Sequence, residues 1–217
     1  MSLIAFFGAL ESGLIYGLVA LGVLISFRTL DFPDLTADGS FPLGGAVAGI
    51  SIIAGVNPWL ACAFGMLAGS VAGIVTAWLH VKLGILQLLA SILVMVALYS
   101  INLRIMGAPN LPLLGETTVF STLVTDGNGY WMRCLIIGVV VIAAMLFLNW
   151  FYSTETGLSM RATGSNLRMA QAQGINTSWM TIIGMAISNG LIALAGALFV
   201  QTQGGADISI GIGTIVI

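Results

Sequence analysis

Charged side chains are scarce in this sequence. Asp, Glu, Lys and Arg make up 6% of the 217 residues, whereas hydrophobic residues make up 59%. Soluble domains carry about a quarter charged residues, so this chain lacks the polar groups needed to cover a water-exposed surface. The composition therefore indicates an integral membrane protein. The net charge of −2 also gives no basic surface of the kind that binds nucleic acid.

Residues that ligate metals or perform catalysis are equally few. His80 is the one histidine, and Cys62 and Cys134 lie in apolar runs, where we expect small buried hydrophobes rather than a disulfide. The sequence contains no Gly-x-Ser-x-Gly, His-Glu-x-x-His or Walker A motif. We therefore expect no metal or cofactor, no enzyme activity and no ATP site in this chain.

Long apolar runs dominate what is present. A membrane-crossing helix needs about 20 mostly apolar residues. Five runs meet that length: Leu3–Phe27, Pro58–Leu79, Leu83–Met106, Tyr130–Tyr152 and Trp179–Val200. A sixth run, Pro42–Val56, would reach about 22 Å as a helix, which is less than the hydrocarbon core. It crosses only if its helix begins near Thr36, and otherwise it is a half-helix that enters from one face. The predicted fold class is an all-α, polytopic transmembrane bundle with interrupted helices.

Basic residues in the loops favour one orientation. With six spans and the 153–178 loop in the cytoplasm, four basic residues lie inside and two lie outside. The inner four are Arg28, Lys82, Arg161 and Arg168, and the outer two are Arg104 and Arg133. This excess of positive charge inside places the N-terminus outside the cell.

Glycines recur at four-residue spacing in several runs. In lipid no hydrophobic effect drives helices together, so small residues on one face allow close packing. The spaced glycines are Gly65, Gly69 and Gly73, the pair Gly13 and Gly17, and the pair Gly45 and Gly49. The pattern predicts a tightly packed bundle and carries no information about a substrate.

A polar stretch interrupts the apolar pattern after the first run. LDFPDLTADGSFP, at Leu30–Pro42, holds Asp31, Asp34 and Asp38, three of the eight acidic residues of the chain. One interpretation is helix capping, because an Asp or Thr ahead of a helix satisfies free N–H groups, worth about 1 kcal/mol. The other is a polar break that lines a solute path. The two interpretations are compatible for Thr36.

A second copy of this pattern lies near the end of the sequence. GLVALGVLISFRTLDFPDLT, at 17–36, aligns without a gap with GLIALAGALFVQTQGGADIS, at 190–209, with six identities in twenty. Asp34 matches Asp207 and Thr36 matches Ser209, so both copies end in Asp, an aliphatic residue and a hydroxyl residue. If five spans separate the copies, the second copy is inverted in the membrane, as in many transporters.

The repeat predicts a translocation path. We assign to it Asp34, Thr36 and Asp38 near the inner mouth, and Asp207 and Ser209 near the outer mouth. Glu11, a charge in the middle of the first apolar run, is assigned to the same path because such charges are costly in lipid. Completing the second repeat would need about four further spans. We therefore expect residues 1–217 to form one permease domain that is cut short at its C-terminus.

The loop Ser153–Asn176 is the richest polar stretch of the sequence. It reads as two short helices with a Gly-Ser-Asn turn between them, capped by Ser165 or Asn166 and ending at Gly174. A solvated connection between two membrane helices needs only a few residues, and long ordered loops are usually functional. We therefore expect this loop to dock a cytoplasmic partner.

Two segments resemble a known family. SGLIYGLVALGVLISFRTLDFPDLTADGSFPLGGAV and SILVMVALYSINLRIMGAPNLPLLGE resemble permease subunits of bacterial ABC importers of the branched-chain amino acid type. The likeness is strongest to the subgroup described as tryptophan/tyrosine or uncharacterised solute importers, and it covers essentially all 217 residues. The family motif ADxSxGIGTIVIG is matched from Ala206 to Ile217, without its final glycine. Family members continue with several further helices.

The resemblance implies a multi-pass permease of the bacterial plasma (inner) membrane that imports a small polar organic solute, such as an amino acid. The implied partners are a cytoplasmic ABC ATPase subunit, an extracytoplasmic solute-binding protein and a second permease copy, all in a setting of membrane lipid. TGLSMRATGSNLRMAQAQGI resembles the cytoplasmic coupling segment of the family. Contact with the ATPase is thereby assigned to Gly157, Arg161, Ala162, Gly164, Asn166, Arg168 and Gly174. The alternative function is a gradient-driven secondary transporter or a channel.

Overall fold

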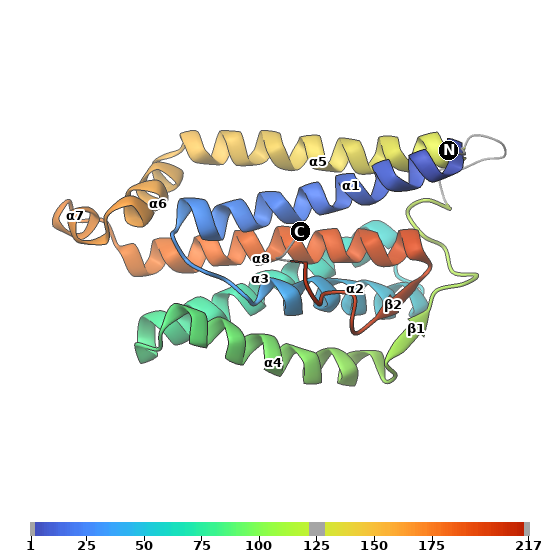
Figure 1. The fold of residues 1–217 in the computed structure, drawn as a ribbon, viewed down its shortest axis with the longest axis horizontal. Coiled ribbons are helices and arrows are strands. Elements are labelled where there is room, and N and C mark those ends of the chain that lie inside the picture. Colours follow the sequence, from blue (N-terminus) through green and yellow to red (C-terminus); the bar gives the residue numbers. More distant parts are fainter. Residues whose placement is uncertain (1–2, 122–128, 215–217) are drawn as a thin grey trace.

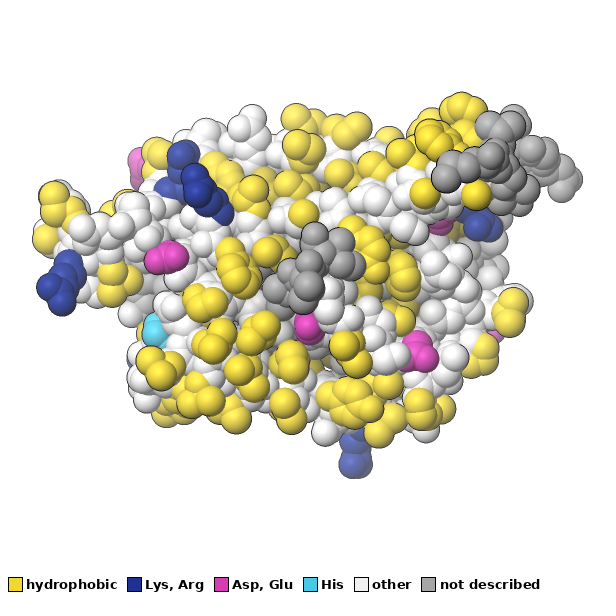
Figure 2. Space-filling view, viewed as in Figure 1, with side chains coloured by type: hydrophobic (Ala, Val, Ile, Leu, Met, Phe, Trp, Pro, Cys, Tyr) yellow, Lys and Arg dark blue, Asp and Glu magenta, His cyan; other side chains and the backbone are white. Residues whose placement is uncertain are grey.

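The computed structural model describes residues 3–121 and 129–214, and long helices lie roughly side by side in it (Figure 1). Five helices within this part of the chain are long and apolar enough to cross a membrane. They are α1 (Leu3–Val23) with its π-helical continuation η1 (Leu24–Thr29), α3 (Pro58–Leu83), α4 (Gln87–Met106), α5 (Gly129–Ser153) and α8 (Thr177–Gln203). The five predicted spans and the all-α fold class are confirmed. Apolar side chains are spread over the face shown in Figure 2, with few charged groups among them.

Helix α2 (Ala37–Ile53) occupies the sixth, shorter apolar run. It begins directly after Thr36, as the crossing interpretation required, and its 17 residues rise about 26 Å. The preceding residues 30–36 contain no α-helix. Thr36 stands at the N-cap position but makes no side-chain capping bond to α2. The prediction that the Thr36 side chain caps α2 is therefore wrong, because its hydroxyl bonds to another helix instead.

Helix α8 is the central element of the bundle. In its most apolar 18-residue segment 67% of the residues are buried, whereas the corresponding segments of the other spans are 28–44% buried. It packs most extensively on α3 and α2 and also contacts α1. A Cβ atom at Gly69 or Gly73 of α3 would collide with backbone carbonyl oxygens of α8, so these glycines permit the close approach that their spacing predicted. Gly13 and Gly17 have no described atom within reach of an added Cβ, so the spacing was misleading there.

The two ends of the bundle carry different structures (Figure 1). At one end, α6 (Glu155–Ser165) and α7 (Leu167–Ala172) form the two short helices expected in the polar loop. The Asn166 side chain caps α7 by accepting from the Met169 N–H at 3.0 Å. Near the other end, β1 (Asn110–Pro112) pairs antiparallel with β2 (Gly205–Asp207). This short pair is a structure that the sequence interpretation did not include.

The two repeat copies run in opposite directions. In Figure 1, α1 leads toward the α6–α7 end, whereas α8 leads away from it. Each helix is followed by a non-helical stretch that holds the Asp-x-hydroxyl sequence. After β2 the chain turns back, and the described part ends over the middle of the bundle (Figure 1). The inversion expected from the alignment is therefore present, and residues 215–217 of the motif Ala206–Ile217 lie outside the described residues.

Candidate functional site

A buried polar cluster lies where α2 begins. Asp34 and Asn189 have no exposed surface. One carboxylate oxygen of Asp34 accepts from the Thr36 N–H at 2.9 Å, and the other accepts from the Asn189 amide nitrogen at 2.7 Å. The Asn189 side-chain oxygen accepts from the Ser40 hydroxyl at 2.7 Å. Side-chain hydrogen bonds from Asn189 thus hold the central helix to Asp34, just before α2, and to Ser40, in the first turn of α2.

Helix α3 contributes to the same cluster. The hydroxyl groups of Thr36 and Thr76 lie 2.9 Å apart, and the Thr76 hydroxyl also donates to the Ala72 carbonyl at 3.1 Å. All three of Thr36, Ser40 and Thr76 are completely buried. We call Asp34, Thr36, Ser40, Thr76 and Asn189 the central polar cluster. Such a cluster is costly to bury inside apolar helices, and in membrane proteins polar groups at this depth are usually functional.

The depth of the cluster differs from the expected one. Asn189 stands near the midpoint of α8 (Thr177–Gln203), so its partner Asp34 lies deep between the helices. Asp34 and Thr36 were expected at a mouth of the path. They lie deeper because the stretch after Thr29 continues inward before α2 starts.

The second break repeats the turn of the first. The N–H of Ser209 donates to an Asp207 carboxylate oxygen at 2.7 Å, as the Thr36 N–H does to Asp34. The Ser209 hydroxyl donates to the same oxygen, and these hydrogen bonds hold the pKa of Asp207 below its usual value. Asp207 and Ser209 lie next to the β1–β2 end and, unlike Asp34 and Thr36, are not buried. The predicted correspondence between the copies therefore holds in local geometry.

The two breaks meet at Asp38. Its carboxylate accepts from the Thr214 hydroxyl at 2.6 Å and from the Gly213 N–H at 3.3 Å. Gly211 lies against the Asp38 carbonyl and the Pro42 ring so closely that a Cβ atom there would collide with both. The stretch that follows β2 is thus held against the first turn of α2, and the interface between the two repeat copies runs through this residue.

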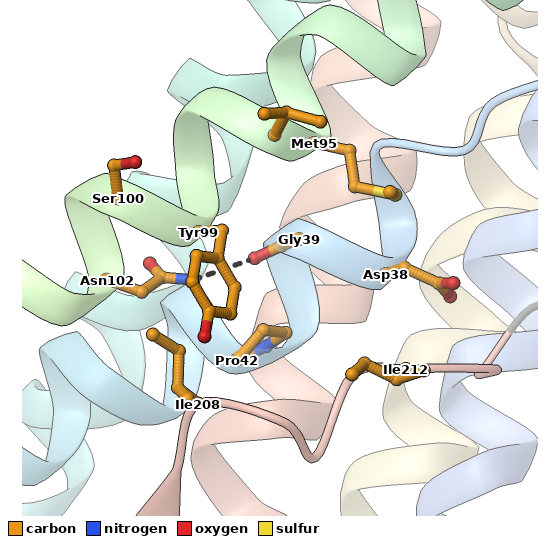
Figure 3. A pocket seen from close by; sticks show the side chains of 10 residues that line it. Asp38, Gly39, Pro42, Met95, Tyr99, Ser100, Asn102, Ile208 and Ile212 are labelled. Atoms are coloured by element: carbon orange, nitrogen blue, oxygen red, sulfur yellow. Dashed lines mark hydrogen bonds between the residues drawn. The ribbon is translucent and has the colours of Figure 1, made fainter. Parts of the chain in front are cut away.

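A cavity of about 310 Å³ opens beside this meeting point, between α2, α4 and the stretch after β2 (Figure 3). Its volume falls in the range of small-molecule pockets. Met95 and Tyr99 of α4 face Ile208 and Ile212 across it, so most of the wall is apolar. The Asp38 carboxylate points away from the Tyr99 ring (Figure 3).

Asn102 of α4 lines the same cavity and holds α2 in place. Its amide nitrogen donates to the Gly39 carbonyl at 3.3 Å. Its side-chain oxygen is buried and has no hydrogen-bond partner within the described part of the chain. A buried acceptor without a partner costs about 1–3 kcal/mol, so the Asn102 oxygen is a polar group in the cavity wall that a solute donor could satisfy.

The structure separates Glu11 from the other predicted path residues. Glu11 is half-buried on α1, and the positive charge that interacts with its carboxylate is Arg133 of α5. The Nε atom of Arg133 is itself buried without a hydrogen-bond partner in the described residues. Glu11 and Arg133 thus form an electrostatic pair on the α1–α5 side, whereas Asp34, Thr36 and Asp38 lie between α2, α3 and α8.

Several residues of the site escaped the sequence interpretation. Asn189, Ser40, Thr76 and Asn102 supply most of the partners described above. Asn189 and Asn102 were visible as amides within apolar runs, which is the signal that could have identified them. Ser40 and Thr76 carried no comparable signal, because hydroxyl side chains are common in membrane helices and often bond to their own helix.

The predicted coupling segment packs against the stretch that leads to the cluster. A Cβ atom at Gly164 of α6 would collide with the Thr29 carbonyl, and the Thr29 hydroxyl lies 2.9 Å from the Tyr152 hydroxyl. The side chains of Leu30 and Met160 both lie against Gly184 of α8. The end of η1 is therefore enclosed by α5, α6 and α8.

The other coupling residues divide between packing and surface. Gly157 lies against the Phe151 carbonyl, where a side chain would collide, and Ala162 is half-buried. Gly174 has a φ of +81°, a left-handed conformation suited to glycine, and it ends the second short helix as expected. Arg161, Asn166 and Arg168 are exposed. These side chains are available to a partner.

Membrane-crossing helices arranged around a buried polar break define a multi-pass membrane protein of the transporter class. Within that class the assignment is specific. Residues 5–217 match the family described as the branched-chain amino acid transport system permease component, so the chain belongs to this family. It is a multi-pass protein of the plasma (inner) membrane, as predicted. No solved structure matches the chain.

Curated relatives support the same family. The chain is 40% identical to a tyrosine transport system permease protein of Clostridioides difficile, over 96% of this chain and 68% of that protein. It is 36% identical to an uncharacterised protein of Rickettsia prowazekii, over 96% of this chain and 72% of that protein. It is 27% identical to an autoinducer 2 import system permease of Escherichia coli, over 86% of this chain and 53% of that protein. The chain is thus a transport-system permease component.

Proposed function

We propose that this chain is the membrane-spanning subunit of an ABC importer that moves an amino acid or a related polar organic solute into the cell. The observation that carries the proposal is the contact between α6 and the stretch that leads into the central polar cluster. Gly164 sits on the Thr29 carbonyl, and Asp34 follows only five residues later. A movement of α6 would reach the buried carboxylate through a short segment of backbone.

This segment has the properties of a transmission element. It begins in the π-helix η1 (Leu24–Thr29), passes through Asp31 with a φ of +52°, and ends at Asp34. π-Helical turns and left-handed residues are less stable than regular helix, so the segment can adopt a second conformation at modest cost. An ATPase drives transport only through an element that has two positions. In this proposal α6 and α7 lie in the cytoplasm and receive the ATPase.

The solute class follows from the relatives and from the cavity. The relative in Clostridioides difficile is named as a tyrosine transport system permease, and the cavity beside Asp38 combines apolar walls with Tyr99 and the buried Asn102 side chain. An amino acid with an apolar or aromatic side chain fits that combination. We therefore propose a path that passes the cluster, with a solute-binding protein outside and a second permease copy completing the translocator.

Transport by the reconstituted system tests the proposal. The chain would be placed in proteoliposomes with a candidate ATPase and solute-binding protein from the same organism, and uptake of radiolabelled tyrosine and leucine would be measured. We expect uptake only when ATP is present on the side of the membrane where the ATPase lies and the binding protein is present on the opposite side. A Walker A lysine substitution in the ATPase is the matched control and should abolish uptake.

A gradient-driven transporter is the second candidate. The observation that favours it is the fully buried Asp34 carboxylate, which has no cationic partner among the described residues, since membrane carboxylates of this kind also serve as proton relays. Uptake driven by a pH gradient without ATP and without the ATPase would establish this candidate and refute the first.

A further inference from the structure

Two arginines line one cavity at the α6–α7 end of the bundle. The cavity has a volume of about 420 Å³ and lies between η1, α5 and α6. Arg28 and Arg161 contribute to its wall together with the amide of Asn149 and the hydroxyl groups of Tyr152 and Ser165. In Figure 2 dark blue side chains gather over the place where α1 ends beside α6. We call this the arginine cavity.

The charges of the arginine cavity are not balanced by the protein. No acidic residue lines it, and neither arginine has a hydrogen-bond or ion-pair partner in the part of the chain that the structure describes. The whole sequence holds only six Lys and Arg residues, and two of them line this one cavity. Like charges that share a cavity repel each other, and an anion placed between them removes that repulsion.

The available donors suit a phosphate group. Each guanidinium presents N–H donors in a planar fork that matches the oxygen atoms of a phosphate. The Asn149 amide is exposed and adds further donors, whereas the Tyr152 hydroxyl is already paired with Thr29. The phosphodiester of a phospholipid headgroup carries its charge on two non-bridging oxygen atoms, one for each guanidinium.

The position of the cavity indicates where the phosphate comes from. Leu24, Phe27 and Trp150 next to it are 44%, 39% and 63% exposed, so the adjacent surface is apolar and faces lipid. An exposed tryptophan beside arginines is typical of the boundary between hydrocarbon and headgroups. Helix α7 projects further from the bundle than this boundary (Figure 1), so a docked protein would meet α7 before it met the cavity.

We propose that Arg28 and Arg161 bind the phosphate of an anionic phospholipid headgroup in the arginine cavity. Basic pockets between membrane helices are known to bind such headgroups. The bound lipid would bridge η1 and α6 at the point where Gly164 meets Thr29. It would therefore hold α6 in its seated position against the transmission segment.

Lipid titration of the purified full chain tests this site. Thermal unfolding in detergent micelles would be followed by tryptophan fluorescence while phosphatidylglycerol, phosphatidylcholine or inorganic phosphate is added. We expect phosphatidylglycerol alone to raise the midpoint at micromolar-to-millimolar levels. Arg28→Gln and Arg161→Gln should each weaken its apparent affinity about fivefold, and the double variant about 25-fold, the change expected from one and two surface charges.

Matched variants separate this site from general charge effects. Arg168→Gln removes an exposed charge on α7 outside the cavity and should leave the affinity unchanged. Arg28→Lys with Arg161→Lys keeps the charge but removes the planar fork, so it should bind more tightly than the double Gln variant and more weakly than wild type. Wild-type affinity in the double Gln variant, or an equal loss in Arg168→Gln, would overturn the proposal.

Two further outcomes also count against a lipid. Equal stabilisation by inorganic phosphate would identify a soluble anion as the ligand. Loss of ATPase binding in the double Gln variant, with unchanged affinity for phosphatidylglycerol, would identify the arginines as part of a protein interface. Because no transport is measured, failure of this test leaves the proposed import function intact.

Discussion

The amide nitrogen of Asn189 donates a 2.7 Å hydrogen bond to the carboxylate of Asp34, which lies 155 positions earlier in the chain. Both residues are completely buried, one on the central helix and the other in a non-helical stretch. The bond fixes the depth at which the first repeat copy breaks. The Asp34 carboxylate could act in stability, in transport or in both, and substitutions at Asp34 distinguish these roles.

Asp34→Asn and Asp34→Ala should differ sharply in stability. The alanine variant leaves one N–H of the Asn189 amide and the Thr36 N–H without an acceptor, which costs about 1–3 kcal/mol for each group. The asparagine variant can keep the bonds to Thr36 and Asn189 only if the Asn189 amide flips, which gives up the 3.2 Å bond from Asn189 to the Met185 carbonyl, so its stability should fall by about 1 kcal/mol, less than in the alanine variant. Thermal unfolding in micelles measures both. Equal loss in the two variants would mean that the charge, rather than the hydrogen bonds, holds the cluster together.

Transport by Asp34→Asn then reports on the charge. If the carboxylate takes part in solute passage, this variant should lose most of the uptake while keeping its fold. Ser40→Ala is a matched control, because it removes one bond from the cluster without changing its charge. Uptake at the wild-type level in Asp34→Asn would confine Asp34 to a structural role.

Single cysteines should report opposite sides of the membrane for the two ends of the bundle. Cys62 and Cys134 are both buried, so the background labelling of the native chain is expected to be low. Ser209→Cys at the β1–β2 end and Ser165→Cys on α6 are exposed and should react with an impermeant maleimide from opposite sides. Thr36→Cys should react slowly from either side, because that position is buried. Reaction of Ser209→Cys and Ser165→Cys from the same side would contradict the inverted arrangement.

Gly164→Leu should uncouple ATP hydrolysis from transport. The added side chain would collide with the Thr29 carbonyl and push α6 away from η1. In the assembled complex we expect the stimulation of ATPase activity by loaded binding protein to fall at least tenfold. Thr156→Leu is the control on the same helix, because Thr156 is exposed and lies outside the arginine cavity, so a leucine side chain should be tolerated there. Normal stimulation in Gly164→Leu would remove the case for α6 as the coupling element.

The glycine pattern makes a further prediction that sequence spacing alone could not. Gly73→Ala should destabilise the bundle by about 1–3 kcal/mol, because its Cβ atom would meet the Met185 carbonyl of α8. Gly17→Ala has no described atom within 4 Å of the added carbon, and the better helix propensity of alanine should make it neutral or stabilising by up to about 1 kcal/mol. Unfolding midpoints of the two variants decide this. A destabilised Gly17→Ala would reveal a contact that the bundle makes with another chain.

The sequence predicted the helices well and the site only in part. Apolar runs of about 20 residues determine membrane helices almost directly, because every backbone group must be satisfied within the run. Asn166 and Gly174 likewise specified the short helices through local capping chemistry. Asn189 and Thr76 could not be placed in this way, since their roles depend on which helices pack together across more than 40 positions of sequence.

The β1–β2 pair and the depth of Asp34 escaped prediction for the same reason. Asn110 pairs with Asp207 only because the ends of α4 and α8 are neighbours in space. The repeat alignment gave the correct correspondence of Asp34 with Asp207 but no depth. Depth depends on where residues 30–36 run, and an irregular stretch of that length has no periodic signal.

The π-helical turn of η1 has a consequence for chain length. A π-turn holds an additional residue compared with an α-helical turn, so Leu24–Thr29 stores a surplus of about one residue ahead of the break. Because the wider turn takes up the extra residue, the chain on either side keeps the register that an uninterrupted α-helix would give it. Removing one residue from Leu24–Thr29 would restore α-helical winding and should leave the bond between Asp34 and Asn189 in place. Removing one residue from the α-helical part of α1 would instead rotate everything after it by about 100°, with an axial shift of about 1.5 Å. The π-helical turn is therefore the place where the first span can change in length without misaligning the Asp34 carboxylate.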